Sequence, residues 1–148
     1  MSSPANATVR DLLASKNSAV VYTCAPETTV AEACRILRDR RVGCLVVVGG
    51  SEVLGLFSER EVAARAVAAG LDPRLAKVSE VMEARVARVP LEATAEEVEA
   101  LLRARRARYL LVVGRRGLLG LISLGDLARF FAAREGALPL EAPTAGLH

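Results

Sequence analysis

The sequence repeats itself once, and this repetition constrains the fold more than any other feature. At a shift of 65 positions, glycines, serines and acidic residues coincide without a gap: Gly55 with Gly120, Ser58 with Ser123, and Glu61 with Asp126. Further upstream the shift becomes 69, and residues 9–13 resemble residues 78–82. Two copies of about 60 residues indicate a duplicated module, because solenoid repeats are shorter and occur at least three times.

Both copies predict the same order of elements, β-α-β-β-α. Thr29 and Thr94 each precede a Glu by three residues, a capping box that starts a helix, and short apolar runs favour strands buried on both faces. The predicted strands are 20–23, 44–48 and 53–57 in the first copy, and 86–89, 110–113 and 118–122 in the second. The last helix of each copy is predicted to begin at Ser58 or Ser123. We therefore expect an α/β (α+β) fold with repeats at 8–70 and 71–134 and tails at 1–7 and 135–148.

Composition excludes several classes of protein. The chain has 148 residues, 52% of them hydrophobic, so it can form a core and is not intrinsically disordered. Its one histidine is His148, which removes most imidazole-based catalysis and metal binding. Neither a signal peptide nor a membrane-spanning run is visible, so a soluble, cytoplasmic protein is predicted. We predict that the chain is not an enzyme and needs no metal, and that Cys24, Cys34 and Cys44 are small buried hydrophobic residues.

The repeated motif is that of a known family. Two β-α-β-β-α copies, each with Gly-h-h-Ser-x-x-acid (h, hydrophobic), resemble the cystathionine β-synthase (CBS) domain pair, or Bateman module. The stretches that carry the resemblance are 55–61 (GLFSERE) and 120–127 (GLISLGDL), with entry helices at 9–13 and 78–82. The chain is most similar to stand-alone two-domain bacterial members, whose second copy carries Ser-h-Gly-Asp. The resemblance implies repeats related by a pseudo-twofold axis, homodimers, and an adenine nucleotide in the cleft between the repeats.

The motif suggests which residues bind the nucleotide. An acid in the first turn of a helix can accept hydrogen bonds from both ribose hydroxyls, and the resemblance assigns this role to Asp126, with Ser123 beside it. In the first copy Glu61 follows Ser58, and its extra methylene predicts a weak, altered or purely structural site. The resemblance places adenine against residues at the start of each first long strand: Val20, Val21 and Tyr22, and Arg85, Val86 and Ala87. By position, Arg60 and Arg108 are candidate phosphate ligands, with Arg85 a third.

The predicted function is regulatory. The module binds AMP foremost, or ADP, ATP or NAD(H), and signals to an unidentified effector protein by a conformational shift. Two alternatives stay open. A ligand-free interaction module is one, because Ser-x-x-acid is also a helix cap. A nucleic-acid binder is the other, using an arginine-rich face that lacks interleaved aromatic residues and shares a helix with acids: Arg103, Arg105, Arg106, Arg108, Arg115 and Arg116.

Overall fold

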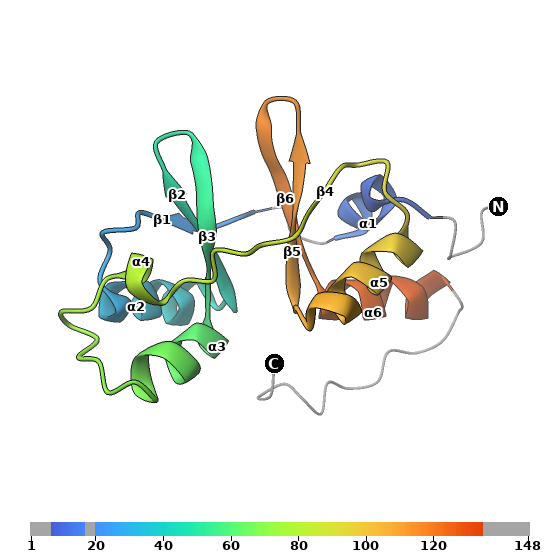
Figure 1. Ribbon diagram of the computed structural model, residues 1–148. Helices are drawn as coiled ribbons and strands as arrows, with labels where there is room; N and C mark the ends of the chain where they lie inside the picture. The colour runs from blue at the N-terminus through green and yellow to red at the C-terminus, as the bar shows by residue number, and fades with distance from the viewer. Residues whose placement is uncertain (1–6, 17–19, 135–148) are drawn as a thin grey trace. The chain divides into compact units, whose positions relative to one another are not determined.

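The computed structural model describes residues 7–16 and 20–134 and shows two small sheets, each accompanied by helices (Figure 1). The first half contains α1 (Val9–Ser15), β1 (Thr23–Cys24), α2 (Val30–Arg40), β2 (Cys44–Gly49), β3 (Glu52–Ser58), α3 (Glu59–Glu61) and the π-helix η2 (Val62–Val67). The second half contains α4 (Val78–Val81), β4 (Arg88–Val89), α5 (Ala95–Arg105), β5 (Tyr109–Gly114), β6 (Gly117–Ser123) and α6 (Leu124–Arg134). These elements confirm the predicted duplicated α/β organisation.

The compact units of the structure do not follow the order of the chain. Unit 2 is the continuous segment Val21–Val86, whereas unit 1 combines the residues up to Val20 with those from Ala87 onward. The entry helix α1 therefore packs with the second copy's sheet, and α4 packs with the first copy's. The boundaries 8–70 and 71–134 refer to the duplicated sequence and stay a prediction. The predicted tails, apart from Ala7, lie outside the described residues.

Unit 2 is built on a three-stranded sheet in the order β1-β2-β3. β1 is parallel to β2, and β2 is antiparallel to β3, with a register shift between Val47 and Val48. The predicted run of apolar residues in β2 is buried as expected, since Leu45, Val46 and Val47 have no exposed surface. Phe57 of β3 and Val30 of α2 belong to the same core, so side chains from both strands and the helix contribute to it.

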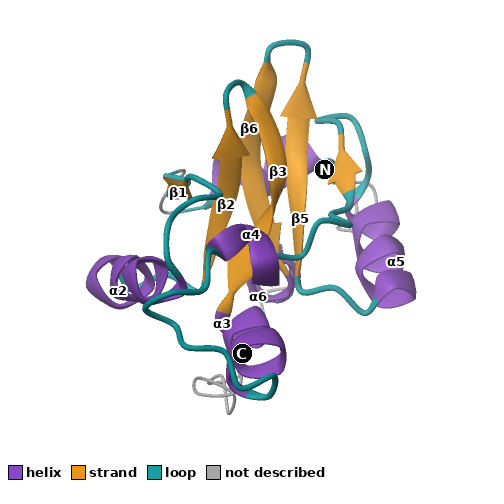
Figure 2. Cartoon of the chain, turned by 60° about the vertical axis from the view of Figure 1, so that its left-hand side comes forward, coloured by secondary structure: helices purple, strands orange, loops and turns teal. Residues whose placement is uncertain are grey.

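Unit 1 repeats this architecture with the sheet order β4-β5-β6 and the same irregularity, here between Val112 and Val113. Figure 2 shows both hairpins, β2–β3 and β5–β6, as long paired strands joined by short loops. Backbone hydrogen bonds hold α1 in unit 1, because the Val9 N–H donates to Ala93 O at 2.8 Å and the Ala95 N–H donates to Ala7 O at 2.7 Å.

The helices that follow the two motifs differ. After Ser123, α6 is a regular α-helix, as predicted. After Ser58, the short α3 continues as the π-helix η2, a form that the sequence pattern does not distinguish from an α-helix. None of the helices in the described ranges has the length and apolar character needed to cross a lipid bilayer.

The predicted burial of the cysteines holds for two of them. Cys24 and Cys44 are buried, whereas Cys34 is half-buried on α2, and all three are free thiols. Burial raises the pKa of the Cys24 thiol to about 11, and it also raises the pKa of Cys34. Because the thiolate is the reactive form, these shifts disfavour nucleophilic or redox chemistry at both residues.

Candidate functional site

Ser123 and Asp126 lie together where β6 ends and α6 begins. The Ser123 N–H donates to Asp126 Oδ2 at 2.9 Å, and the Asp126 N–H donates to Ser123 Oγ at 3.0 Å. The two residues therefore cap the first turn of α6 reciprocally. The sequence predicted this pair both as a ribose site and as a helix cap, and the structure shows the capping bonds. Asp126 remains partly accessible, with 13% of its side chain exposed.

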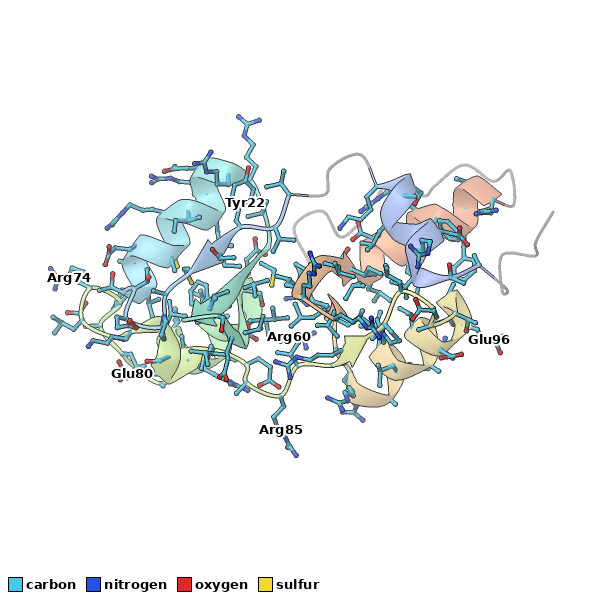
Figure 3. The ribbon with its side chains drawn as sticks, turned by 90° about the horizontal axis from the view of Figure 1, so that it is seen from above. Tyr22, Arg60, Arg74, Glu80, Arg85 and Glu96 are labelled. Carbon is cyan, nitrogen blue, oxygen red and sulfur yellow. The ribbon has the colours of Figure 1, made fainter. Side chains whose placement is uncertain are left out.

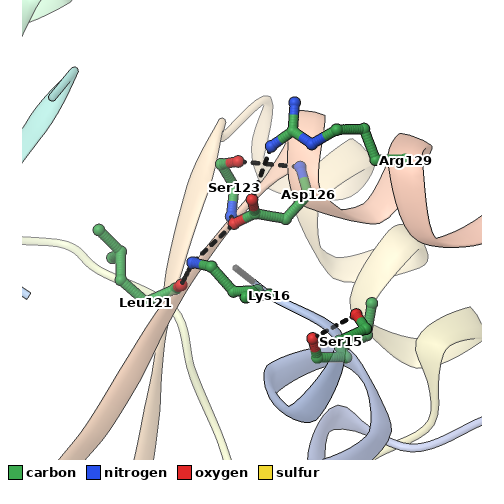
Figure 4. A network of polar contacts seen from close by, with 7 residues as sticks. Ser15, Lys16, Leu121, Ser123, Asp126 and Arg129 are labelled. Atoms are coloured by element: carbon green, nitrogen blue, oxygen red, sulfur yellow. Dashed lines mark hydrogen bonds and ion pairs between the residues drawn. The ribbon is translucent and has the colours of Figure 1, made fainter. Parts of the chain in front are cut away.

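Lys16 also binds the Asp126 carboxylate. At the end of α1, its Nζ lies 2.9 Å from Asp126 Oδ2 and donates to the Leu121 carbonyl at 2.7 Å. Figure 4 shows the ammonium group between the β6 backbone and the carboxylate. Sequence reasoning missed this residue, because a lone lysine after a short helix carries no motif. Only the packing of α1 in unit 1 brings it here.

Arg129 contacts the other oxygen of the same carboxylate. Its Nη2 donates to Asp126 Oδ1 at 2.7 Å from one turn further along α6 (Figure 4). A Cβ added to Gly125 would lie 3.3 Å from Arg129 Nη1, so the guanidinium rests beside the first turn of the helix. Sequence reasoning missed Arg129 too, although its spacing of three residues from an acid is a recognisable signal for a helical ion pair.

The surroundings of Asp126 favour its ionised form. Burial raises the pKa of the carboxyl, but the hydrogen bond from the Ser123 N–H and the Lys16 ammonium outweigh burial and lower it. Asp126 is thus a carboxylate at neutral pH. Such a group can only accept hydrogen bonds, and hydroxyl or cationic donors are its natural partners.

The equivalent pair in unit 2 is more enclosed. Glu61 Oε1 accepts hydrogen bonds from the Ser58 N–H at 2.8 Å and from the Ser58 hydroxyl at 2.7 Å. Only 3% of Ser58 and 7% of Glu61 are exposed. The longer glutamate side chain therefore folds back onto its own cap. The pair thus caps the start of α3, and a weak, altered or purely structural first site stays a prediction.

The other predicted site residues of unit 1 lie next to the strands of its sheet: Ala87 precedes β4, and Arg108 precedes β5. The Ala87 carbonyl accepts from the Leu111 N–H at 2.9 Å, so Ala87 is tied to β5. The Arg108 carbonyl accepts from the Leu124 N–H at 2.8 Å and thus contacts the first residue of α6. The Arg108 guanidinium lies 5.9 Å from the centre of the Tyr109 ring. The structure brings the Arg108 backbone to the start of α6 and directs its guanidinium over an aromatic ring.

The other predicted residues of unit 2 are exposed or half-buried. The Tyr22 carbonyl accepts from the Val46 N–H at 3.0 Å, and the Arg40 guanidinium lies 5.2 Å from the Tyr22 ring centre. Arg85 is exposed and extends away from the ribbon (Figure 3). Arg60 is also exposed, and Val21 and Val86 are half-buried; all three lie in unit 2.

Unit 2 has a separate hollow on its helices. It has a volume of about 400 Å³ and lies between α2 and the α3–η2 helix. Its lining is mostly aliphatic with one charged residue of each sign, and consists of Cys34, Leu37, Arg38, Glu59, Val62, Ala63 and Val67. Val67 at its edge is 71% exposed. The hollow includes neither Ser58 nor Glu61, so it is distinct from the first motif.

Within the described ranges, no group of three or more His, Cys, Asp or Glu side chains is placed to hold a metal ion.

The arginine-rich stretch contains an ion pair within its own helix. Arg103 Nη2 donates to Glu99 Oε1 at 2.6 Å on α5. Part of the positive charge on this face is therefore compensated by the acids of α5.

Comparison with known proteins agrees with the motif and the fold. The family model described as "CBS domain" matches twice, at residues 9–67 and 78–133. The chain is 31% identical over 117 residues to the CBS domain-containing protein YhcV of Bacillus subtilis, covering 79% of this chain and 83% of YhcV. It is 28% identical over 124 residues to Hypoxic response protein 1 of Mycobacterium tuberculosis, covering 82% and 83% of the two chains.

Solved structures show the same fold. A protein with CBS domains from Burkholderia ambifaria superposes with a TM-score of 0.83 at 29% identity, covering 90% of this chain and 99% of that one. A CBS-domain containing protein from Agrobacterium tumefaciens gives a TM-score of 0.77 at 28% identity, covering 84% and 93%. With two matches to the family model, the Gly-h-h-Ser-x-x-acid motif in both halves and this shared fold, the chain belongs to the CBS domain family and carries a pair of CBS domains.

Proposed function

We propose that this CBS pair is a regulatory module that binds an adenine nucleotide through the Asp126 carboxylate of unit 1. The observation that carries the proposal is the state of that carboxylate. It is ionised, partly accessible, and fixed at the start of α6 by the Ser123 N–H and Lys16. A ribose diol offers two hydroxyl donors, which suit a fixed anionic acceptor.

Arg108 and the first turn of α6 add to this proposal. The Leu124 N–H is bound by the Arg108 carbonyl, so the segment before β5 lies against the start of α6. The helix start carries a partial positive charge, which favours the phosphate of a nucleotide. AMP is the nucleotide we favour, with ADP, ATP and NAD(H) as related candidates that share its ribose and adenine.

Unit 2 does not offer an equivalent acceptor. Glu61 is almost fully buried and accepts hydrogen bonds from its own capping serine. We therefore propose that Asp126 provides the main ribose contact and that the Ser58–Glu61 pair stabilises the fold of its unit. Nucleotide binding should then depend on one of the two motifs.

The module would act by differential binding and without catalysis. A nucleotide that binds one conformation of the chain more tightly shifts the population toward it and alters a surface read by an effector protein. CBS domain pairs typically serve as regulatory modules, and the Asp126 site provides a hydrogen-bond acceptor for such a ligand. No reaction step is needed for this role.

Isothermal titration with AMP, ADP, ATP, NAD(H) and S-adenosylmethionine tests the proposal. We expect AMP to bind, and Asp126→Ala to weaken binding by about 1.5–3 kcal/mol for each hydrogen bond lost to the charged group. Glu61→Gln is the matched control, because it alters the motif acid of the other unit, and should leave the affinity within about twofold. Absence of heat and of thermal stabilisation with every ligand at millimolar concentration would overturn the proposal.

A ligand-free interaction module is the second candidate, and the reciprocal capping bonds of Ser123 and Asp126 favour it. In that case Asp126→Ala lowers the free energy of unfolding, while no nucleotide changes the melting temperature. The same titration therefore separates the two functions, because only the first gives a nucleotide-dependent stabilisation.

We also infer that two copies associate through the helices of unit 2. Val67 is 71% exposed at the edge of the aliphatic hollow, and burial of such a surface favours association. Light scattering coupled to size-exclusion chromatography should show a dimer for the unmodified chain and a monomer for Val67→Glu. A Val20→Glu variant, which also replaces an exposed valine, should stay dimeric.

A further inference from the structure

We propose that, when no ligand is bound, the Arg129 guanidinium occupies an acceptor position on the Asp126 carboxylate that a ribose hydroxyl takes in the complex. The ribose diol displaces this guanidinium, which then binds the phosphate and so favours nucleotides over unphosphorylated nucleosides. This inference rests on the proposed function, because it concerns the same carboxylate. It adds a residue that sequence reasoning did not identify and a reason for ligand selectivity.

The Asp126 carboxylate already accepts hydrogen bonds at most of its lone-pair positions. A carboxylate offers about four lone-pair positions on its two oxygens. Oδ2 of Asp126 accepts from the Ser123 N–H and from Lys16 Nζ, and Oδ1 accepts from Arg129 Nη2. Three of the four positions are therefore used. A ribose diol needs two, so one of the three donors must leave.

The three donors to Asp126 differ in what their departure would cost. The Ser123 N–H is a backbone group that caps α6, and its loss would uncap the helix. Lys16 is 22% exposed and also binds the Leu121 carbonyl, so its departure breaks two contacts. Arg129 is 65% exposed, and water can solvate its guanidinium at little cost. Arg129 is thus the donor that exchanges most easily.

The displaced Arg129 guanidinium has room beside the first turn of α6. Arg129 Nη1 already lies beside Gly125, which has no side chain to block it. The guanidinium therefore stays at the first turn of α6, where the partial charge of the helix also attracts anions. The phosphate of AMP is bonded to the same ribose that takes the arginine's place. A guanidinium suits such a group, because its planar fork of donors matches phosphate oxygens.

Unit 2 places its arginine differently. At the shift of 65 positions, Arg60 corresponds to Gly125 and Ala64 corresponds to Arg129. Ala64 cannot form the ion pair that Arg129 forms with Asp126, and Glu61 is nearly fully buried. The exchange is therefore a property of the second motif alone.

The test compares AMP with adenosine, which has the ribose but no phosphate. Titrations on the full chain measure both affinities for the unmodified protein, Arg129→Met and Arg129→Lys. In Arg129→Met we expect adenosine to bind roughly twofold to fivefold more tightly, because a competing ion pair is gone. We expect the preference for AMP over adenosine to fall roughly tenfold or more, because a charge-assisted contact to phosphate is lost. Arg129→Lys keeps the charge and should restore part of the preference.

The matched control is Arg103→Met. Arg103 is an exposed arginine in the same unit and is likewise paired with an acid on its own helix, so this variant removes the same charge away from Asp126. Its preference for AMP should equal that of the unmodified chain. Melting temperatures of all variants establish that each is folded at the titration temperature.

The outcomes separate this inference from the proposed function. An unchanged AMP preference in Arg129→Met, or equal weakening of both ligands, overturns the role of Arg129. If Asp126→Asn still weakens AMP and adenosine together in that case, the ribose site itself stands. If the unmodified chain binds neither ligand, the proposed function and this inference are both wrong.

Discussion

Lys16 and Asp126 form an ion pair of 2.9 Å that joins the end of α1 to the start of α6. Both side chains are largely buried, and Lys16 also donates to the β6 backbone at Leu121. The pair therefore fixes an entry helix and the Asp126 carboxylate to the same strand. This arrangement links the stability of unit 1 to the ionisation of its candidate ligand-binding acid.

Replacing Lys16 should weaken unit 1. In Lys16→Met, Asp126 and the Leu121 carbonyl both lose a donor, and we expect a loss of about 1–3 kcal/mol in the free energy of unfolding at pH 7. The Asp126 pKa should rise toward its ordinary range, because Lys16 is one of the groups that lower it. Urea unfolding measures the first effect, and a carboxyl NMR titration measures the second. Lys77→Met is the control, because Lys77 is exposed and is the only other lysine; equal losses in both variants would contradict the assigned role.

The stability contributed by Asp126 should depend on pH with a definite sign. Its pKa is lower in the folded chain than the ordinary value of 3.8. Ionisation therefore stabilises the fold above that value, and the contribution disappears as the pH falls through the lowered pKa. We expect Asp126→Asn to be less stable than the unmodified chain at pH 7, with the difference closing as the pH falls below 3.8. Thermal unfolding across this range checks the prediction, and a gap independent of pH would count against it.

Replacing the two motif glycines, Gly55 and Gly120, by alanine should lower the free energy of unfolding by different amounts. A Cβ at Gly55 would lie 2.6 Å from the Glu83 backbone carbonyl oxygen, whereas one at Gly120 would lie 2.9 Å from the Leu13 side chain. A leucine side chain can rotate away, but a backbone carbonyl paired to β3 cannot do so without shifting the chain. We expect Gly55→Ala to cost about 2–3 kcal/mol and Gly120→Ala about 1 kcal/mol. Chemical denaturation of the two variants measures both losses, and a larger loss in Gly120→Ala than in Gly55→Ala would contradict this prediction.

Arg106, at the end of α5, has a left-handed backbone conformation, and its replacement by glycine should increase the free energy of unfolding. Arg106 has a φ of 52°, a conformation that non-glycine residues adopt at a cost. We expect Arg106→Gly to stabilise the chain by about 0.5–1 kcal/mol, since relief of strain exceeds the added entropy of the unfolded state. Arg105→Gly, one position earlier inside the helix, should destabilise it by about 1 kcal/mol. Differential scanning calorimetry distinguishes the two, and a lower melting temperature for Arg106→Gly would disprove the gain.

The duplicated sequence predicted most of the elements for a physical reason. Strand and helix boundaries depend on local signals, such as the Thr29 cap and the buried run at 44–48, and these signals occur in both copies. The assignment of each entry helix could not be predicted. The segments 9–13 and 78–82 are both short and apolar, and only tertiary packing decides that α1 binds Ala93 and its neighbours in unit 1.

The candidate site was predictable only in part. Ser123 and Asp126 follow from their spacing, yet the same letters describe a helix cap, so sequence alone left two readings open. Lys16 reaches Asp126 through the packing of α1, which no local pattern encodes. The closed geometry of Glu61 depends on burial of the longer side chain, a property of the folded core.

The division of the chain into units has a consequence for biosynthesis. Unit 2 is one continuous segment, so all of its contacts are available as soon as Val86 has left the ribosome. α1 is synthesised before its partners Ala93 and β6, so unit 1 can close only after these later segments have left the ribosome. Lys16 would remain without its acid until Asp126 has left the ribosome. In a nascent chain stalled before residue 120, unit 2 should therefore already be folded and resist a protease, whereas α1 should still be cleaved.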